Sequence, residues 1–250
     1  MKLEEALNKS GVSAIVYGES GIGKTYFSGT FSGKTLIIAA EKNGIKTLAT
    51  SKNIKNLDVV FLPEPGKSIE VTADRYNQFF DNLMVQEIDA DNIVFDSATE
   101  LANQLLIYKT DPNKNGGVPT MKNYGEVQFS MKRYLRILRD LADVRGKNVI
   151  VIALETELVL SQNEDAQTSK THPNLSGKKL APEAEGLFDI VAHLEKKSDG
   201  TRFFRLEGNA THVAKDRFGR KFCKADGDTL ISGKVGNEEQ TNPAPAQKKG

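Results

Sequence analysis

The segment that most constrains the fold of this chain is GESGIGKT, residues 18–25, which lies between the apolar run VSAIVY (12–17) and YFSGTF (26–31). Glycine, four residues and then Gly-Lys-Thr is the pattern of a phosphate-binding loop that joins a strand to a helix. Glycines let the backbone N–H groups point at phosphate oxygens, and the following helix presents its positive end to the same anion. Pattern and context therefore favour a nucleotide cradle over a flexible glycine turn.

The loop predicts most of the cofactor contacts. The Lys24 ammonium is expected to reach the β- and γ-phosphates, and the Thr25 hydroxyl to ligate Mg²⁺. The cofactors predicted by the motif are therefore a nucleoside triphosphate and Mg²⁺. The expected nucleotide-binding residues are Gly18, Glu19, Ser20, Gly21, Ile22, Gly23, Lys24, Thr25 and Tyr26.

Short apolar runs alternate with amphipathic segments along the chain. Runs without polar alternation are typical of strands buried on both faces of a parallel sheet, and here they lie at 12–17, 35–40, 59–62, 92–96 and 148–154. Residues 124–145 carry an apolar stripe at steps of three or four, which predicts a helix, and residues 72–87 are a weaker helix candidate. The alternation predicts an α/β, doubly wound, mostly parallel sheet of the P-loop NTPase type.

The last third of the chain has a different character. Residues 189–197, 201–208 and 212–215 are expected to form antiparallel strands joined by tight turns. Two long polar segments, 110–123 and 156–181, are interpreted as irregular loops, which in a compact domain are functional or disordered. We expect one domain over residues 1–235, followed by a disordered, almost apolar-free tail at 236–250.

Composition excludes several classes of protein. Among 250 residues, 34 Lys and Arg balance 33 Asp and Glu, so a nucleic-acid partner would have to be recognised by local patches. Cys223 is the single cysteine, which rules out an intrachain disulfide and fits a reducing, cytoplasmic setting. No apolar run approaches the ~20 residues of a membrane helix. The three histidines have no metal-ligand spacing, so we expect no zinc site.

Three carboxylates end apolar runs and are candidates for the chemistry of the loop. Asp96 is expected to hold Mg²⁺ opposite Thr25; the alternative is a cap on the helix that begins near residue 97. Glu41 could polarise the attacking water, or be a solvated charge at a strand end. Glu155 could sense the γ-phosphate and relay its presence into the following loop, or simply mark a loop boundary.

Together these motifs resemble a known family. GESGIGKT, AAEKNG, IVFDSATEL, YGEVQFSMKRYLRILRDL, PNLSGKKLAPEAEGLFDIV and HVAKDRFG, in this order, are similar to the phage-encoded, core-only RecA-like ATPases of the Sak type, over roughly residues 11–221. The resemblance implies a RecA-like fold and ATP as the nucleotide. It also implies single-strand annealing or recombination on single-stranded DNA in the host cytoplasm. The expected form is a homo-oligomer with ATP at subunit interfaces, and a single-strand-binding protein is a possible further partner.

The resemblance also assigns roles. Asp96 takes the magnesium-binding role, Glu41 matches the catalytic glutamate, and Glu155 stands where RecA has a glutamine that senses the γ-phosphate. Lys215 and Arg217 fall where RecA-like proteins place cations that reach a neighbouring subunit's γ-phosphate. A spacing of two on a strand would put both on one face, and from the residues alone a solvated strand face beside Asp216 is the favoured interpretation.

The two long polar segments fall where RecA carries its DNA-contacting loops. Their lysines can follow a phosphate backbone and a flanking tyrosine could stack on a base, although charges in loops are usually just solvated. Two other functions stay open: a P-loop ATPase that remodels or loads protein partners, and a nucleotide-binding module with little hydrolysis. The candidate DNA-contacting residues are Tyr108, Lys109, Lys114, Lys122, Tyr124, Lys170, His172, Lys178 and Lys179.

Overall fold

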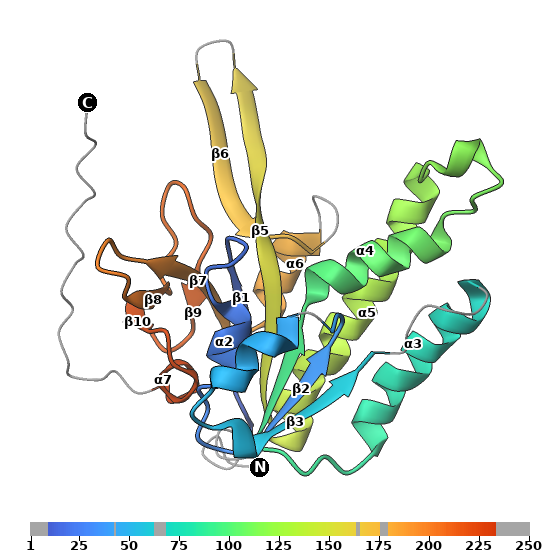
Figure 1. Cartoon of the computed structure of the whole chain (residues 1–250). Coiled ribbons are helices and arrows are strands. Elements are labelled where there is room, and N and C mark those ends of the chain that lie inside the picture. The colour runs from blue at the N-terminus through green and yellow to red at the C-terminus, as the bar shows by residue number, and fades with distance from the viewer. Residues whose placement is uncertain (1–9, 43, 63–68, 164–165, 176–179, 234–250) are drawn as a thin grey trace.

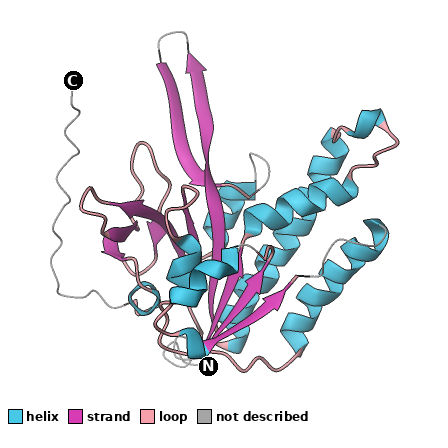
Figure 2. Cartoon of the chain, viewed as in Figure 1, coloured by secondary structure: helices cyan, strands magenta, loops and turns pink. Residues whose placement is uncertain are grey.

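The computed structural model describes residues 10–42, 44–62, 69–163, 166–175 and 180–233. The predicted tail at 236–250 and the candidates Lys178 and Lys179 lie outside these ranges. Figure 1 names the elements, and Figure 2 shows helices on both sides of a central sheet. The chain is therefore an α/β protein with a doubly wound sheet, as the alternating apolar runs predicted.

The core of the sheet is parallel and has the order β7-β1-β5-β4-β2-β3. Parallel strands end at the same edge, and the register brings Gly18 opposite Leu154, and Asp96 opposite both Ile152 and Ala39. One strand, β5, separates the strand of the phosphate loop from the strand that ends in Asp96. The bounds are β1 (Ser13–Gly18), β2 (Thr35–Ala39), β3 (Leu57–Phe61), β4 (Asn92–Asp96), β5 (Asn148–Asn163) and β7 (Ile190–Lys196).

Helices cover both faces of this sheet because each buried strand points alternate side chains to opposite sides. Ile15 packs in the core cluster under α3, α4, α5 and α6, whereas its neighbour Val16 packs in the cluster under α2, η1 and α7. The helices are α2 (Lys24–Ser28), α3 (Ile69–Val85), α4 (Ala98–Lys109), α5 (Met121–Arg145), α6 (Leu180–Leu187) and α7 (Gly227–Ile231); the short 3-10 helices are η1 (Gly44–Thr50), η2 (Ile54–Asn56) and η3 (Asn115–Gly117).

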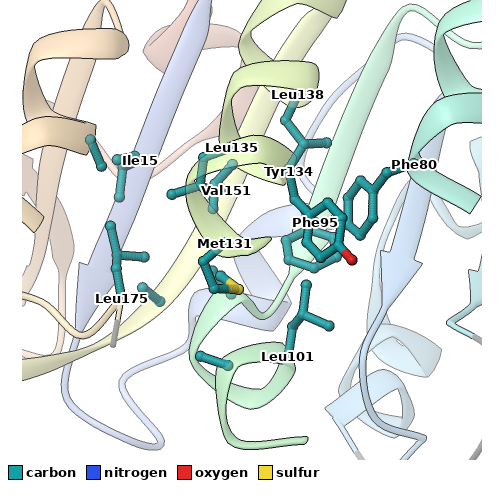
Figure 3. Close-up of a cluster of buried hydrophobic side chains, with 14 of the residues drawn as sticks. Ile15, Phe80, Phe95, Leu101, Met131, Tyr134, Leu135, Leu138, Val151 and Leu175 are labelled. Carbon is teal, nitrogen blue, oxygen red and sulfur yellow. The ribbon is translucent and has the colours of Figure 1, made fainter. Parts of the chain in front are cut away.

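The larger core cluster is built on the long helix α5 (Figure 3). The apolar stripe predicted along this helix is buried, with Met131 and Leu138 fully inaccessible to solvent. Tyr134, which the stripe did not include, stacks on Phe80 of α3 with ring centroids 4.1 Å apart, and Phe80 lies 5.8 Å from Phe95 of β4. These three aromatic rings pack α3 and α5 against β4, the strand that ends in Asp96. No helix in the described ranges is long and apolar enough to cross a membrane.

The predicted antiparallel strands in the last third are confirmed in part. β7 pairs parallel with β1 and antiparallel with β8 (Arg202–Arg205), and β10 (Phe222–Lys224) pairs antiparallel with β8. The expected strand at 212–215 is reduced to β9 (Lys215–Asp216), because the chain reaches β7 only at Ile190 and Val191. Arg217 lies beyond β9, so the argument that a strand places it on one face with Lys215 does not apply.

The second long polar segment is not an irregular loop, and that prediction was wrong. β5 continues past the sheet to Asn163 and pairs antiparallel with β6 (Ala166–Pro173), and the hairpin projects beyond the body of the molecule (Figure 1). Threonine and valine favour strands, but polar residues dominate the projecting part and hide the alternation of a half-buried strand. The first segment is irregular as predicted between residues 110 and 120, apart from η3, and its last three residues begin α5.

Candidate nucleotide-binding site

The phosphate loop begins where the fully buried strand β1 ends at Gly18. Two glycines then adopt left-handed backbone angles, with φ of 76° at Gly21 and 110° at Gly23. Residues with a Cβ rarely adopt these angles, and Gly23 immediately precedes the first residue of α2. The glycines of the motif therefore serve the sharp turn that brings the helix N-terminus over the end of the sheet.

Lys24 is held inside this loop. Its side chain is largely buried, and its Nζ donates to the backbone oxygens of Gly18 at 2.8 Å and Glu19 at 2.6 Å. Burial lowers the pKa of the Lys24 ammonium, while the negative charges of Asp96, Glu155 and Glu19 act in the opposite direction. The loop thus contains a cation that is poorly solvated and ready to pair with phosphate oxygens.

Thr25 and Asp96 meet across β5. The Thr25 hydroxyl donates to Oδ2 of Asp96 at 2.7 Å, although the two residues lie 71 positions apart in the chain. Burial raises the pKa of the Asp96 carboxyl, and the hydrogen bond from Thr25 and the charge of Lys24 partly offset this rise. The alternative role of Asp96 as a helix cap belongs instead to Ser97, whose side chain accepts from the backbone N–H of Glu100.

A cavity of about 320 Å³ opens above these groups. It brings the phosphate loop together with Asp96 and Glu41, and burial raises the pKa of Glu41, as do the charges of Glu100 and Asp96. A hydroxyl and a carboxylate at 2.7 Å are hard oxygen donors that fit Mg²⁺, which prefers one or two protein ligands plus phosphate. The residues that line the cavity are Ser20, Gly21, Gly23, Lys24, Thr25, Tyr26, Glu41, Gly44, Thr47, Asp96, Ser97, Thr99, Glu100, Asn103, Ile152 and Leu154.

Glu155 begins a chain of interacting polar side chains beside the cavity. Its Oε2 lies 3.0 Å from Nε2 of His193, and Nδ1 of His193 lies 3.2 Å from Oε1 of Glu195. Glu195 in turn pairs with Arg205, and the ring of His193 stacks on His212 at 4.4 Å. Glu155 is therefore a hydrogen-bonded group within β5, at the base of the projecting hairpin, and not a residue at the boundary of a loop.

Lys215 and Arg217 are not brought to the phosphate loop of their own chain. They lie near the start of β7, at the edge of the sheet opposite to Gly18. Nζ of Lys215 donates to the backbone oxygens of Glu185 and Phe188, and Arg217 pairs with Asp189 at 2.9 Å. Any contact of these cations with a nucleotide would have to be made with a neighbouring subunit.

The candidate DNA-contacting residues in the first loop are largely engaged. Lys109 and Lys122 each lie within 4 Å of Glu126, at 3.6 and 3.9 Å, and Lys114 lies 3.4 Å from Asp111. Tyr108 is only 9% exposed, so it cannot stack on a base, whereas Tyr124 is 43% exposed. In the hairpin, Lys170 is half-buried and His172 is buried beside Pro173.

Several site residues were missed by the sequence reasoning. Glu100 lines the cavity, and Arg202 of β8 donates from Nε to the backbone oxygen of Ile22 at 2.5 Å, beside Gly23. The spacing of Ser97 and Glu100 is a helix-start signature that could have drawn attention to α4. Nothing local in the sequence predicts the contact of Arg202, because 180 positions separate it from Ile22.

Within the ranges that the structure describes, no group of three or more His, Cys, Asp or Glu side chains is placed to hold a metal ion. Any Mg²⁺ would therefore depend on Thr25, Asp96 and the phosphates of the nucleotide together.

Comparison with known proteins gives one family match. A family model described as an AAA domain matches residues 10–218, which is more than half of the chain. No curated protein matches the sequence. The matched range contains the phosphate loop, Asp96, the projecting hairpin and both candidate cations near β9.

Proposed function

Since this chain belongs to the AAA domain family, we propose that it binds ATP with Mg²⁺ at residues 18–25 and hydrolyses it. The observation that carries the proposal is the convergence of Lys24, Thr25 and Asp96. The Thr25–Asp96 hydrogen bond of 2.7 Å joins the first turn of α2 to the end of β4, and both residues line the cavity. A glycine turn without a nucleotide role would not need a buried lysine and a half-buried carboxylate at this point.

The side chains divide the work of phosphoryl transfer. Lys24 pairs with the terminal phosphate oxygens. Thr25 and Asp96 would hold Mg²⁺, which would neutralise charge on those oxygens. Glu41 orients the attacking water and accepts its proton as the new bond to the γ-phosphorus forms and the bond to ADP breaks. The products are ADP and inorganic phosphate.

Two contacts support a link between the cavity and the hairpin. Thr99 lines the cavity, and its hydroxyl accepts from the backbone N–H of Leu154 at 2.9 Å and donates to the backbone oxygen of Asn174 at 2.7 Å. Glu155 is the next residue along β5 and pairs with His193. A change at the cavity would therefore bear on both strands at the base of the hairpin, and we propose that the hairpin reports the nucleotide state to a partner.

We propose single-stranded DNA as that partner, in annealing or recombination by a homo-oligomer. The resemblance to Sak-type RecA-like ATPases supports this choice, since by that resemblance the segment that forms the hairpin corresponds to a DNA-contacting loop. In this assembly Lys215 or Arg217 would exchange its present partners for the γ-phosphate of a neighbouring subunit, and a single-strand-binding protein could deliver the DNA.

A protein partner is the second candidate, and a specific observation favours it. The described lysines of the first loop lie close to carboxylates, and the chain as a whole has a formal net charge of +1. Phosphate contacts would have to compete with those ion pairs. An ATPase that remodels or loads proteins would need no such basic surface.

Phosphate release separates these functions when it is measured with and without single-stranded DNA over a range of protein concentrations. The proposal expects Mg²⁺-dependent release, stimulation by DNA, and specific activity that rises with protein concentration. Lys24→Ala should abolish release, and Arg217→Ala should slow it without weakening nucleotide binding. Release that DNA does not change would favour a protein partner. If Arg217→Ala keeps full activity, the assignment of a cation acting between subunits fails.

A further inference from the structure

Gln104, on the second turn of α4, makes three hydrogen bonds around the nucleotide cavity. Its Nε2 donates to the backbone oxygen of Ala40 at 2.9 Å and to Oε1 of Glu100 at 3.0 Å. Its Oε1 accepts from the hydroxyl of Tyr76, a fully buried residue of α3, at 2.9 Å. One side-chain amide thus joins the end of β2, the start of α4 and the middle of α3.

The partners determine which way this amide faces. A backbone carbonyl and a carboxylate both accept hydrogen bonds, so the nitrogen of Gln104 must face Ala40 and Glu100. A reversed amide would place its oxygen against two other acceptors and leave the Tyr76 hydroxyl without this acceptor. Both donors of the amide and its acceptor are therefore used in one orientation.

Both backbone polar groups of Ala40 are hydrogen-bonded. The N–H donates to the backbone oxygen of Asp96 at 2.7 Å, and the carbonyl oxygen accepts from Nε2 of Gln104. Glu41 follows directly and lines the cavity. β2 ends at Ala39, so the bond from Gln104 adds a second constraint to the backbone of the residue that precedes Glu41.

We propose that Gln104 is a positioning residue for ATP hydrolysis, which acts by fixing where Glu41 stands relative to Asp96 and the phosphate loop. This inference rests on the proposed function, in which Glu41 orients the attacking water. Gln104 also holds the carboxylate of Glu100, a second acidic group that lines the cavity. Gln104 itself touches no reacting atom.

A double-mutant cycle tests this mechanism. If Gln104 acts through Glu41, the losses of kcat from the two single substitutions do not add in the double variant. The variants are Gln104→Met, which keeps the size but removes all three hydrogen bonds, Glu41→Gln, and both together. Displacement of a catalytic group by about 1 Å costs up to roughly a hundredfold in rate. We expect Gln104→Met to lower kcat by about tenfold or more while the affinity for a fluorescent ATP analogue changes less than about threefold.

In the Glu41→Gln background the same substitution should lower kcat by less than about twofold, because the group that it positions is already disabled. Tyr76→Phe, which leaves the amide in place but removes one partner, should give a smaller loss of kcat than Gln104→Met and covers the case that Gln104→Met does not fold. Ile107→Ala, on the exposed side of the same helix, is the matched control and should leave kcat unchanged.

Three results would overturn the inference. The first is an equal loss of kcat in both backgrounds, which means that Gln104 acts independently of Glu41. The second is full activity of Gln104→Met, and the third is a loss that appears only in nucleotide affinity. A wild-type protein that binds no nucleotide is a different outcome, recognised before any variant is made, and it removes the proposed function and this inference together.

Discussion

Thr99→Val tests whether the cavity and the hairpin are physically joined. Thr99 is 3% exposed, and its hydroxyl both accepts from the N–H of Leu154 and donates to the carbonyl of Asn174. Valine has nearly the same shape, so the substitution leaves no cavity but deprives two backbone groups of their partner. Thr99→Ser is the matched control, because it keeps the hydroxyl and loses a methyl group.

The expected loss in free energy of unfolding for Thr99→Val follows from these contacts. Each buried polar group left without a partner costs about 1–3 kcal/mol, so two cost about 2–6 kcal/mol. Partial access of water to Asn174 places the total near the lower end, at about 2 kcal/mol. Loss of the methyl group in Thr99→Ser should cost about 1 kcal/mol. Urea unfolding measures both values, and hydrogen exchange should show faster exchange of the Leu154 amide in Thr99→Val alone. If Thr99→Val is as stable as the wild type and its Leu154 amide stays protected, the proposed link does not exist.

Two further predictions concern titratable groups. Burial raises the pKa of Glu195, but hydrogen bonds from His193 and Arg205 and the charge of Arg205 outweigh it and lower the pKa to about 2. A depressed carboxyl pKa stabilises the fold above pH 4.5 and that stability is lost as the pH falls toward 2. The wild type should therefore lose about 3 kcal/mol of stability as the pH falls from 4.5 to 2, and Glu195→Gln should not show this loss in acid unfolding. Burial raises the pKa of the Cys223 thiol to about 12, so a thiol-specific disulfide reagent at pH 8 should react roughly a hundredfold slower with native protein than with unfolded protein; equal rates would contradict this burial.

The parts of the fold that could be predicted from sequence are those with a local signal. The apolar runs at 12–17 and 92–96 are strands because they are buried on both faces, and the stripe of Met131 and Leu138 is buried as its helical spacing required. The phosphate loop was predictable because the roles expected of its residues are local: the glycines allow the turn, the lysine binds phosphate and the threonine binds Mg²⁺. The meeting of Thr25 with Asp96 follows from parallel strands that end at a common edge.

Other features depend on tertiary contacts that no local pattern encodes. The hairpin after Glu155 was interpreted as a loop because its polar residues obscure strand periodicity. The pairing of Glu155 with His193, and the three bonds of Gln104, join residues that lie 28 to 64 positions apart, apart from the local contact with Glu100. Lys215 lies on a strand, β9, as expected, but its ammonium is engaged by backbone oxygens around the end of α6, which the sequence did not indicate.

The most direct test of the account is calorimetric titration of the folded protein with ATP in the presence and absence of Mg²⁺. We predict binding heat from the wild type that strengthens with Mg²⁺, and none from Lys24→Ala, with circular dichroism showing that both are folded. Asp96→Asn should retain binding but lose most of the Mg²⁺ dependence. Folded wild-type protein that gives no heat with any purine triphosphate, with or without the metal, would contradict the assignment of residues 18–25 as a nucleotide site.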